Sequence, residues 1–522
     1  MPVVTVQLGQ CGNQLGCAFF QALGQEFASV DYGRQAVEEW FRPLQGGGQG
    51  VHTRGDTDRY VARAVMIDME PKVVNACRAA AASGSTWWRY PPRGFLTMSS
   101  GSGNNWAHGF HGYGPTVHED TLDLVRREVE ACDLLGGFSL VQSMAGGTGA
   151  GLGTYVAQAL RDEYQSSHIV NCCVWPYESG EVIVQSYNTL LTLTHLHELS
   201  DGIVLMSNEA LHRTAHKIYN IPRPSFGDMN AIAARAMANL LLPSTSRPAS
   251  GSSPAGGGGH ADARAGTPGG RASPSTSAGP GAGSASRPGS AHSAGAPPSP
   301  ATPVGGGATR GGWPGLEGGG GTPHRLLSDM VSQLCCHPHY RLLSLRSIPQ
   351  VPAASTEFTT FSWGAMLKRL RQMHITGSVQ EEGMDWGVTT ADSSPQGGGG
   401  HRQWRHPGMN RALASWLVLR GQASGEVDAS EFGDPGMYPE WTLDPLKVTY
   451  ASQRFNNYLM AAASLSNDQA PLGPITRMQE AAYAMLASRA FVHQYEAYGL
   501  GVADFQGCFA HVEEIAARYA SL

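Results

Sequence analysis

The sequence predicts an α/β protein whose first half is a largely parallel β-sheet with helices on both faces. Two observations carry this prediction. Short apolar segments alternate with longer amphipathic segments up to residue 243, which is the pattern of parallel strands joined by helices. The residues that follow the apolar segments are small, polar or acidic, and ligands of such sheets bind outside the carboxyl ends of the strands. We therefore expect the functional site at that edge.

The elements of this first half follow from the spacing of apolar residues. Leu122, Val125, Val129 and Cys132 recur at alternating spacings of three and four, which indicates a helix between two strands. The expected strands are Val3–Leu8, Ala64–Ile67, Phe95–Met98, Phe138–Met144, Ile169–Val174 and Ile203–Met206.

Length and composition predict several parts. A chain of 522 residues is too long for one core. Residues 244–322 are nearly all Gly, Ser, Ala, Pro, Thr and Arg, so this insert cannot offset its ordering entropy and is expected to be disordered. The expected parts are a nucleotide-binding domain with a long central helix (1–243), the insert (244–322), a smaller α+β domain (323–465) and a C-terminal helical region (466–522).

Charge and cysteine content exclude several classes of protein. A net charge of -6 gives no basic field for nucleic acid. The nine cysteines are scattered without a C-x-x-C motif, which indicates reduced thiols in an intracellular protein. We expect neither secretion nor a membrane span, because the chain shows no signal-like start and no apolar run of about 18 residues.

The glycine-rich turn Ala145–Gly151 is the strongest functional signal. It links a strand to a helix, and glycines at a helix start leave backbone N–H groups open to an anion such as phosphate. A dinucleotide fingerprint fits poorly, because Leu152 stands where the third glycine belongs. A Walker A loop is excluded, since no Lys-Ser or Lys-Thr closes the run. A connector without a ligand stays possible on this segment alone.

Three further strand ends carry residues suited to the same ligand. Gly9–Gln14 contains two glycines at a helix start, and its alternative is a structural turn with an asparagine cap. Asp68 and Glu70 can meet a magnesium ion beside a triphosphate, although such pairs are often only solvated or capping. Ser99–Trp106 is a Gly/Ser-rich turn in which Asn104 is the favoured ligand-binding residue.

These motifs resemble those of the tubulin family. The run of a small residue, Gly-Gly-Thr-Gly, Ala and Gly at 145–151 matches its signature, and Gly9–Gln14 and Gly101–Trp106 match two of its other loops. The resemblance implies a three-layer GTPase domain, an intermediate α+β domain and a C-terminal helical hairpin, with GTP or GDP and Mg²⁺ as cofactors.

The resemblance also assigns roles to individual residues. The loop of Asn104 wraps the terminal phosphate, and the acidic pair Asp68 and Glu70 holds magnesium. The ribose loop departs from the family, since Glu181 and Gln185 stand where tubulins commonly carry Asp and Glu. Phe226 stands where a tyrosine often stacks on the base. The residues implied to bind nucleotide are Gly9, Gln10, Cys11, Asn13, Asn104, Ala145, Gly146, Gly147, Thr148, Gly149, Glu181, Gln185, Asn208, Phe226 and Asn230.

Hydrolysis needs a group that orients water, and none of the glycine loops supplies one. In tubulins that acid comes from the next subunit. Asp329 lies at the position of the catalytic Glu of alpha-tubulin, whereas a helix-capping role is the alternative. We expect at most a GTPase completed by a neighbouring subunit.

The second half predicts the remaining elements. Strands are expected around Leu342–Ile348 and at Thr356–Trp363, then a helix at 366–373, and a second low-complexity loop at 396–400. Arg489–Tyr495 resembles the paired C-terminal helices of tubulins.

Three short segments, Leu345–Pro349, Leu370–Met373 and Trp175–Tyr177, resemble the delta branch of the family. This implies a cytoplasmic, cytoskeletal protein of centrioles and basal bodies, acting in the assembly of triplet microtubules. Its implied partners are other tubulins, alpha, beta or itself, and centriolar proteins, with no membrane and no nucleic acid. The alternatives are a nucleotide-bound adaptor that neither polymerises nor hydrolyses and, more distantly, a dinucleotide oxidoreductase.

Overall fold

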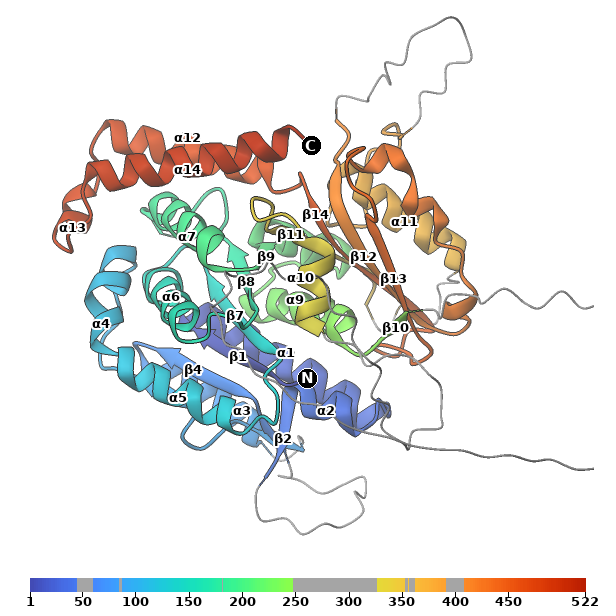
Figure 1. Cartoon of the computed structure of the whole chain (residues 1–522), viewed down its shortest axis with the longest axis horizontal. Helices are drawn as coiled ribbons and strands as arrows, with labels where there is room; N and C mark the ends of the chain where they lie inside the picture. The colour runs from blue at the N-terminus through green and yellow to red at the C-terminus, as the bar shows by residue number, and fades with distance from the viewer. Residues whose placement is uncertain are drawn as a thin grey trace, which may run out of the picture. The chain divides into compact units, whose positions relative to one another are not determined.

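A computed structural model describes residues 1–44, 60–83, 87–180, 182–246, 326–352, 355, 362–390 and 408–522. These residues belong to one compact unit, which joins the chain before the insert to the chain after it. A single mixed sheet of eleven strands runs through that unit (Figure 1). Its order is β10-β13-β12-β14-β11-β9-β8-β7-β1-β4-β6.

The six strands predicted in the first half are all present and pair in parallel. They are β1 (Val3–Leu8), β4 (Ala64–Asp68), β6 (Phe95–Thr97), β7 (Gly137–Ser143), β8 (Ile169–Trp175) and β9 (Gly202–Ser207). The strands β2 (Phe41–Pro43), β3 (Tyr60–Ala62) and β5 (Trp88–Arg89) form a separate small sheet.

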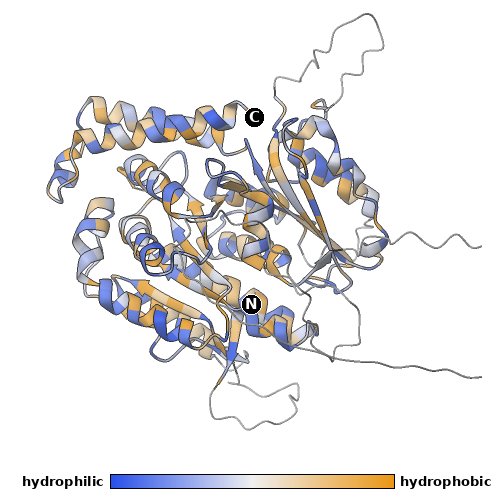
Figure 2. Ribbon diagram, viewed as in Figure 1, coloured by the Kyte–Doolittle hydropathy of each residue, from blue (hydrophilic) through white to orange (hydrophobic). Residues whose placement is uncertain are grey.

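Helices cover both faces of the sheet, and each face has its own hydrophobic core. In β1, Val4, Val6 and Leu8 belong to one core and Val3 to the other, because successive side chains of a strand point to opposite faces. In Figure 2 the surrounding helices mix hydrophobic and hydrophilic residues, as helices with one buried side do. The three-layer α/β prediction is confirmed.

The helices that form these layers fall into two groups. One face carries α5 (His118–Glu130), α6 (Gly153–Glu163), α7 (Gln185–Leu199), α12 (Leu472–Ala487) and α14 (Val502–Ala520). The other carries α1 (Gly9–Ser29), α3 (Pro71–Ala82), α9 (Phe226–Leu241) and α10 (Leu326–Leu334). The shorter helices α2 (Arg34–Trp40), α4 (Gly114–Thr116), α8 (Asn208–Arg213) and α13 (Val492–Glu496) lie between them in the chain.

The second half extends the same sheet. Strand β11 (Leu342–Ile348) pairs in parallel with β9 and antiparallel with β14 (Met460–Asp468). Next come β12 (Ala412–Gly421), β13 (Leu446–Ala451) and the short β10 (Thr245–Ser246), and α11 (Trp363–Thr376) packs against β11 and β14. The expected boundary between the first two folded parts stays a prediction, although the sheet continues through it. Helices α12 and α14 lie side by side at the C-terminal end (Figure 1) and pack on α7, which confirms the helical hairpin.

Two predicted segments, the insert and the strand at Thr356–Trp363, have different boundaries in the structure. The insert was expected from residue 244, but Thr245 and Ser246 form β10 and the Ser244 hydroxyl donates to Thr449 Oγ1 at 2.9 Å. Residues 247–322 lie outside the described residues, as do the low-complexity loop 396–400 and residues 356–361 of the expected strand. The last residue of that strand, Trp363, begins α11 instead, after Ser362 accepts a capping hydrogen bond from the Ala365 amide.

Candidate functional site: a nucleotide rim at the carboxyl edge

Three turns meet where the parallel strands end, at an edge that we name the carboxyl edge. They are residues 9–13 after β1, residues 101–106 after β6 and residues 145–149 after β7. Strand β1 lies between β4 and β7, with Leu8 opposite Ile67 and Gln7 opposite Val141. This register brings the turns of distant sequence segments together. We call the three turns the rim.

Glycines let the rim close at backbone distance. A Cβ added at Gly147 would lie 2.2 Å from Ser102 Oγ and 2.7 Å from the carbonyl oxygen of Asn105. Gly9 has a φ of +70°, and a Cβ there would lie 2.7 Å from the Gly149 amide nitrogen. Contacts this short leave no room for a side chain, so both positions require glycine.

The glycine turn continues into a short π-helix, η2 (Thr148–Leu152), and only then into α6. The helix predicted after the glycine turn is therefore present, and its first turn is π-helical. Within the turn, the amides of Gly151 and Leu152 both donate to the Gly147 carbonyl. The Thr148 hydroxyl lies 3.1 Å from Ser102 Oγ, so it links two turns of the rim.

Asn104 and Gly146 face one another across the rim. Asn104 is exposed, its φ is +56°, and its side-chain oxygen would lie 3.9 Å from a Cβ placed on Gly146. Its neighbour Asn105 turns inward, where its Nδ2 donates to the carbonyl of Gln494 at 2.8 Å. Asn104, which the sequence favoured as a ligand-binding residue, is thus the exposed one of the two asparagines, and its role in binding stays a prediction.

The predicted nucleotide-binding residues of the first turn differ in exposure. Gln10 is exposed and Cys11 half-buried, whereas Asn13 is fully buried. Asn13 Nδ2 donates to the carbonyls of Gly9 at 2.8 Å and Ile67 at 3.1 Å. Its amide group therefore fastens the turn to the end of β4.

The predicted metal pair lies next to the rim. Burial raises the pKa of Asp68 to about 6, although the backbone amides of Glu70 and Met69 donate to the carboxylate and oppose the shift. Glu70 is exposed, and its Oε1 would lie 2.6 Å from a Cβ at Gly101. Among the described residues no group of three or more His, Cys, Asp or Glu side chains is placed to hold a metal ion. Two carboxylates suit a magnesium ion that takes its other ligands from phosphate and water.

The residues expected at ribose and base are placed in different ways. Glu181 lies outside the described residues. Gln185, the first residue of α7, is buried, and its Nε2 donates to the Tyr177 carbonyl at 2.6 Å. Asn208 is half-buried at the start of α8.

Phe226 and Asn230 lie one turn apart at the start of α9, so their side chains share a face. The Phe226 ring is 43% exposed, which is unusual for a large apolar side chain. Ser225 and Asp228 form a capping box that fixes this helix start, and hydrogen bonds from Ser225 lower the pKa of Asp228. An exposed ring on a fixed helix start is a suitable platform for stacking.

Asp329 lies away from the rim, at the opposite edge of the sheet, which we name the amino edge. Its helix α10 also carries Leu327, whose Cδ1 would lie 3.0 Å from a Cβ on Gly137, the first residue of β7. Its carboxylate is paired with Lys447 Nζ at 3.3 Å. Within one chain the structure does not bring Asp329 to the other predicted site residues, so only another molecule could carry it there.

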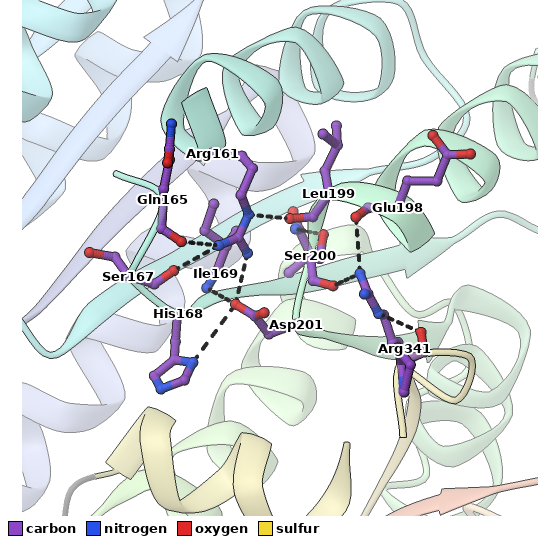
Figure 3. A network of polar contacts seen from close by, with 12 residues as sticks. Arg161, Gln165, Ser167, His168, Ile169, Glu198, Leu199, Ser200, Asp201 and Arg341 are labelled. Atoms are coloured by element: carbon purple, nitrogen blue, oxygen red, sulfur yellow. Dashed lines mark hydrogen bonds and ion pairs between the residues drawn. The ribbon is translucent and has the colours of Figure 1, made fainter. Parts of the chain in front are cut away.

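The amino edge contains an arginine network that the sequence analysis missed (Figure 3). Arg161 bonds Asp201 Oδ2 at 2.8 Å and donates to the carbonyls of Leu199 and Ser167. Arg341 donates to the carbonyls of His197, Glu198 and Ser200. Both arginines satisfy carbonyls at the end of α7, which have no partners within the helix. Only the folded chain brings these residues together, so no sequence signal marked them.

Asn188, in α7, is a further residue to which the sequence alone gave no role. It is fully buried and bonds both the Asn104 and the Ala145 carbonyls. A single asparagine inside the apolar run of α7, near Leu190 and Leu191, was the available signal.

A cavity of about 370 Å³ lies elsewhere, among β9, α8, α9 and β11. None of the residues predicted to bind nucleotide lines it. No helix in the described part of the chain is long and apolar enough to cross a membrane.

Comparison with known proteins agrees with this geometry. Residues 2–216, which contain the rim, match the family model described as the GTPase domain of the tubulin/FtsZ family. A GTPase domain of this kind implies binding of GTP or GDP. The tubulin delta chains of Canis lupus familiaris, Mus musculus and Homo sapiens are 33%, 34% and 32% identical to this chain. Each alignment covers 100% of both sequences. The chain belongs to the tubulin family.

Proposed function

We propose that this tubulin holds a guanine nucleotide at the rim, with the phosphates against residues 9–13, 101–106 and 145–149. The observation that carries the proposal is the close approach of Gly147 to the Ser102 side chain and the Asn105 backbone, which brings two glycine-rich turns together. Asn208, Phe226 and Asn230 would receive the base, and Gln185 and Glu181 the ribose.

The test is to denature the purified chain and identify the released nucleotide by chromatography. GDP or GTP in about one copy per chain is the expected result. NAD, or no nucleotide from a chain that also binds no added GTP, would contradict the proposal.

Magnesium would be held by Asp68 and Glu70 together with phosphate oxygens. The ion supplies positive charge beside the terminal phosphate, while Asp68 must be ionised to bind it. The carboxylate of Asp68 accepts two backbone N–H groups, so its position is set before the ion arrives.

We further propose that hydrolysis, if the chain performs it, requires Asp329 of a second subunit. The carboxylate would orient water toward the terminal phosphate of its neighbour. The pairing of Asp329 with Lys447 gives a specific reason to keep the alternative of a non-hydrolysing, nucleotide-bound adaptor. A carboxylate that already faces a lysine of its own chain is less free to reach water in a neighbouring subunit.

The two functions differ in how turnover depends on protein concentration. An acid supplied in trans gives turnover that rises more steeply than linearly, and Asp329→Asn should lower it at least 10-fold. Ser332→Ala is the matched control, because that hydroxyl donates only to the Asp329 backbone carbonyl among the described residues. Bound GTP without turnover, or an unchanged rate in Asp329→Asn, supports the adaptor.

The cellular role that we propose is assembly of triplet microtubules at centrioles and basal bodies, with other tubulins and centriolar proteins as partners. The similarity to tubulin delta chains over the whole chain supports this role. Electron microscopy of centrioles after depletion of the protein is the test. Loss of the third tubule is expected, and intact triplets would contradict the role.

A further inference from the structure

Asn188 joins three segments that lie far apart in the sequence. Its side chain is fully buried in α7, behind the rim. Its Nδ2 donates to the carbonyl oxygens of Asn104 and Ala145, both at 2.7 Å. One amide group thus fixes the spacing between the second and third turns of the rim.

The oxygen of the same side chain is used as well. Asn188 Oδ1 accepts the Trp106 amide at 3.1 Å and the Tyr495 hydroxyl at 2.6 Å. All four hydrogen-bonding positions of the amide group are occupied, and a network in which each buried member is satisfied is rigid.

Tyr495 belongs to α13, between the two long C-terminal helices. A second hydrogen bond also joins the rim to α13, since Asn105 Nδ2 donates to the Gln494 carbonyl at 2.8 Å. His108 also stacks on Tyr498 with ring centroids 4.5 Å apart. The residues after α12 therefore hold the turn that contains Asn104.

We propose that Asn188 is a positioning residue for the nucleotide's terminal phosphate and that Tyr495 acts through it, which links the C-terminal hairpin to the discrimination between GTP and GDP. This inference rests on the proposed nucleotide site. Asn188 touches no substrate itself. It sets the distance between Asn104 and the glycine turn, and a change there affects a nucleotide with a third phosphate more than one without.

Tyr495→Phe is the sharper variant, because it removes one hydroxyl and keeps the ring. Tyr187→Phe is its matched control, since the Tyr187 hydroxyl is buried nearby but donates to the Ala490 carbonyl at 3.2 Å. The measurement is the ratio of the GTP and GDP dissociation constants of each full-length variant. Loss of one buried hydrogen bond should cut the preference for GTP about 5-fold in Tyr495→Phe and leave it unchanged in Tyr187→Phe.

Asn188→Asp provides a second variant. It keeps the acceptor for Trp106 and Tyr495 but sets an oxygen against two carbonyls, so the preference for GTP should fall at least 10-fold. Equal ratios in Tyr495→Phe and the unchanged chain would overturn the inference, as would equal shifts in the two phenylalanine variants. A wild-type chain that binds neither nucleotide would contradict the proposed function instead, so the two failures are distinguishable.

Discussion

At the carboxyl edge of the parallel strands backbone lies against backbone, whereas at the amino edge arginine side chains bind backbone carbonyls. Gly147 and Gly9 let turns approach within contact distance. Arg161 and Arg341 instead occupy the carbonyls around the end of α7. The carboxyl edge is where we propose that the nucleotide binds, whereas the arginines of the amino edge bond groups of the protein itself. Changes at the two edges should therefore have different consequences.

The largest expected effect is that of Gly147→Ala. The added Cβ would meet Ser102 Oγ at 2.2 Å and backbone atoms at 2.7 Å, so the rim must open. We expect about 1–3 kcal/mol of lost stability and loss of nucleotide binding. Gly364→Ala, in α11 outside the rim, is the control, because no atom would lie within 4 Å of its added Cβ. Calorimetric titration with GTP checks both, and equal affinities of the two variants would contradict the role of close packing.

Arg161→Leu tests the amino edge. The substitution removes the ion pair with Asp201, in which both side chains are about three-quarters buried, and leaves several carbonyls without a partner. About 2 kcal/mol of stability should be lost while GTP affinity stays unchanged. Urea unfolding and nucleotide titration together measure this. A change of affinity comparable with that in Gly147→Ala would show that the edges are not independent.

The folding stability should depend on pH through Asp68, which lies at the carboxyl edge. Its folded-state pKa, about 6, lies above the ordinary value of 3.8 because of burial. Stability from this group is present in full below pH 3.8 and is lost as pH rises through 6. At pH 7 Asp68→Asn should stabilise the nucleotide-free chain by about 1–2 kcal/mol but weaken magnesium-dependent binding.

The exposed Glu70 offers a control for the Asp68 variant. Glu70→Gln should weaken magnesium-dependent binding without a gain in stability. Thermal unfolding of both variants between pH 4 and pH 8, without nucleotide, is the measurement. A stability difference between Asp68→Asn and wild type that does not grow with pH would refute the burial argument.

The smallest effect on stability is expected for Phe226→Ala, because the ring is 43% exposed. Its removal should cost about 1 kcal/mol in guanine nucleotide affinity and less than about 0.5 kcal/mol in stability. Fluorescence titration with a guanine nucleotide analogue checks it. A stable Phe226→Ala variant that binds nucleotide normally would remove Phe226 from the site.

The strands of the first half could be predicted because each one is a short apolar run, and the small or polar residues that end it are its immediate neighbours in the sequence. Val3–Leu8 was predicted to the residue, and the first strand of the second half was placed at Leu342–Ile348. The end of the strand expected at Thr356–Trp363 was wrong, since the Ser362 cap starts a helix there and local hydrophobicity does not reveal it.

The candidate site likewise contains features that could be predicted from the sequence and features that could not. The glycines of the rim could be predicted because they lie close together in the sequence. They are required there because a side chain would clash with the neighbouring turn. The contacts of Asn188, Arg161 and Arg341 form only in the folded chain, where Asn188 bonds Tyr495 from 307 residues away, so local patterns do not identify their partners. The roles of the individual site residues in binding nucleotide stay predictions.

The short strand β10 has a consequence for how this chain tolerates its long interruption. Thr245 and Ser246 pair with Tyr450 and Thr449 of β13, and Asp329, soon after the chain re-enters the fold, is tied to Lys447 of the same strand. The chain is therefore held to β13 both just before the insert and just after it. The entropy of closing a loop grows only with the logarithm of its length, so residues can be gained or lost between these anchors at little thermodynamic expense. Divergence in length at this point leaves the sheet, and both of its edges, as they are.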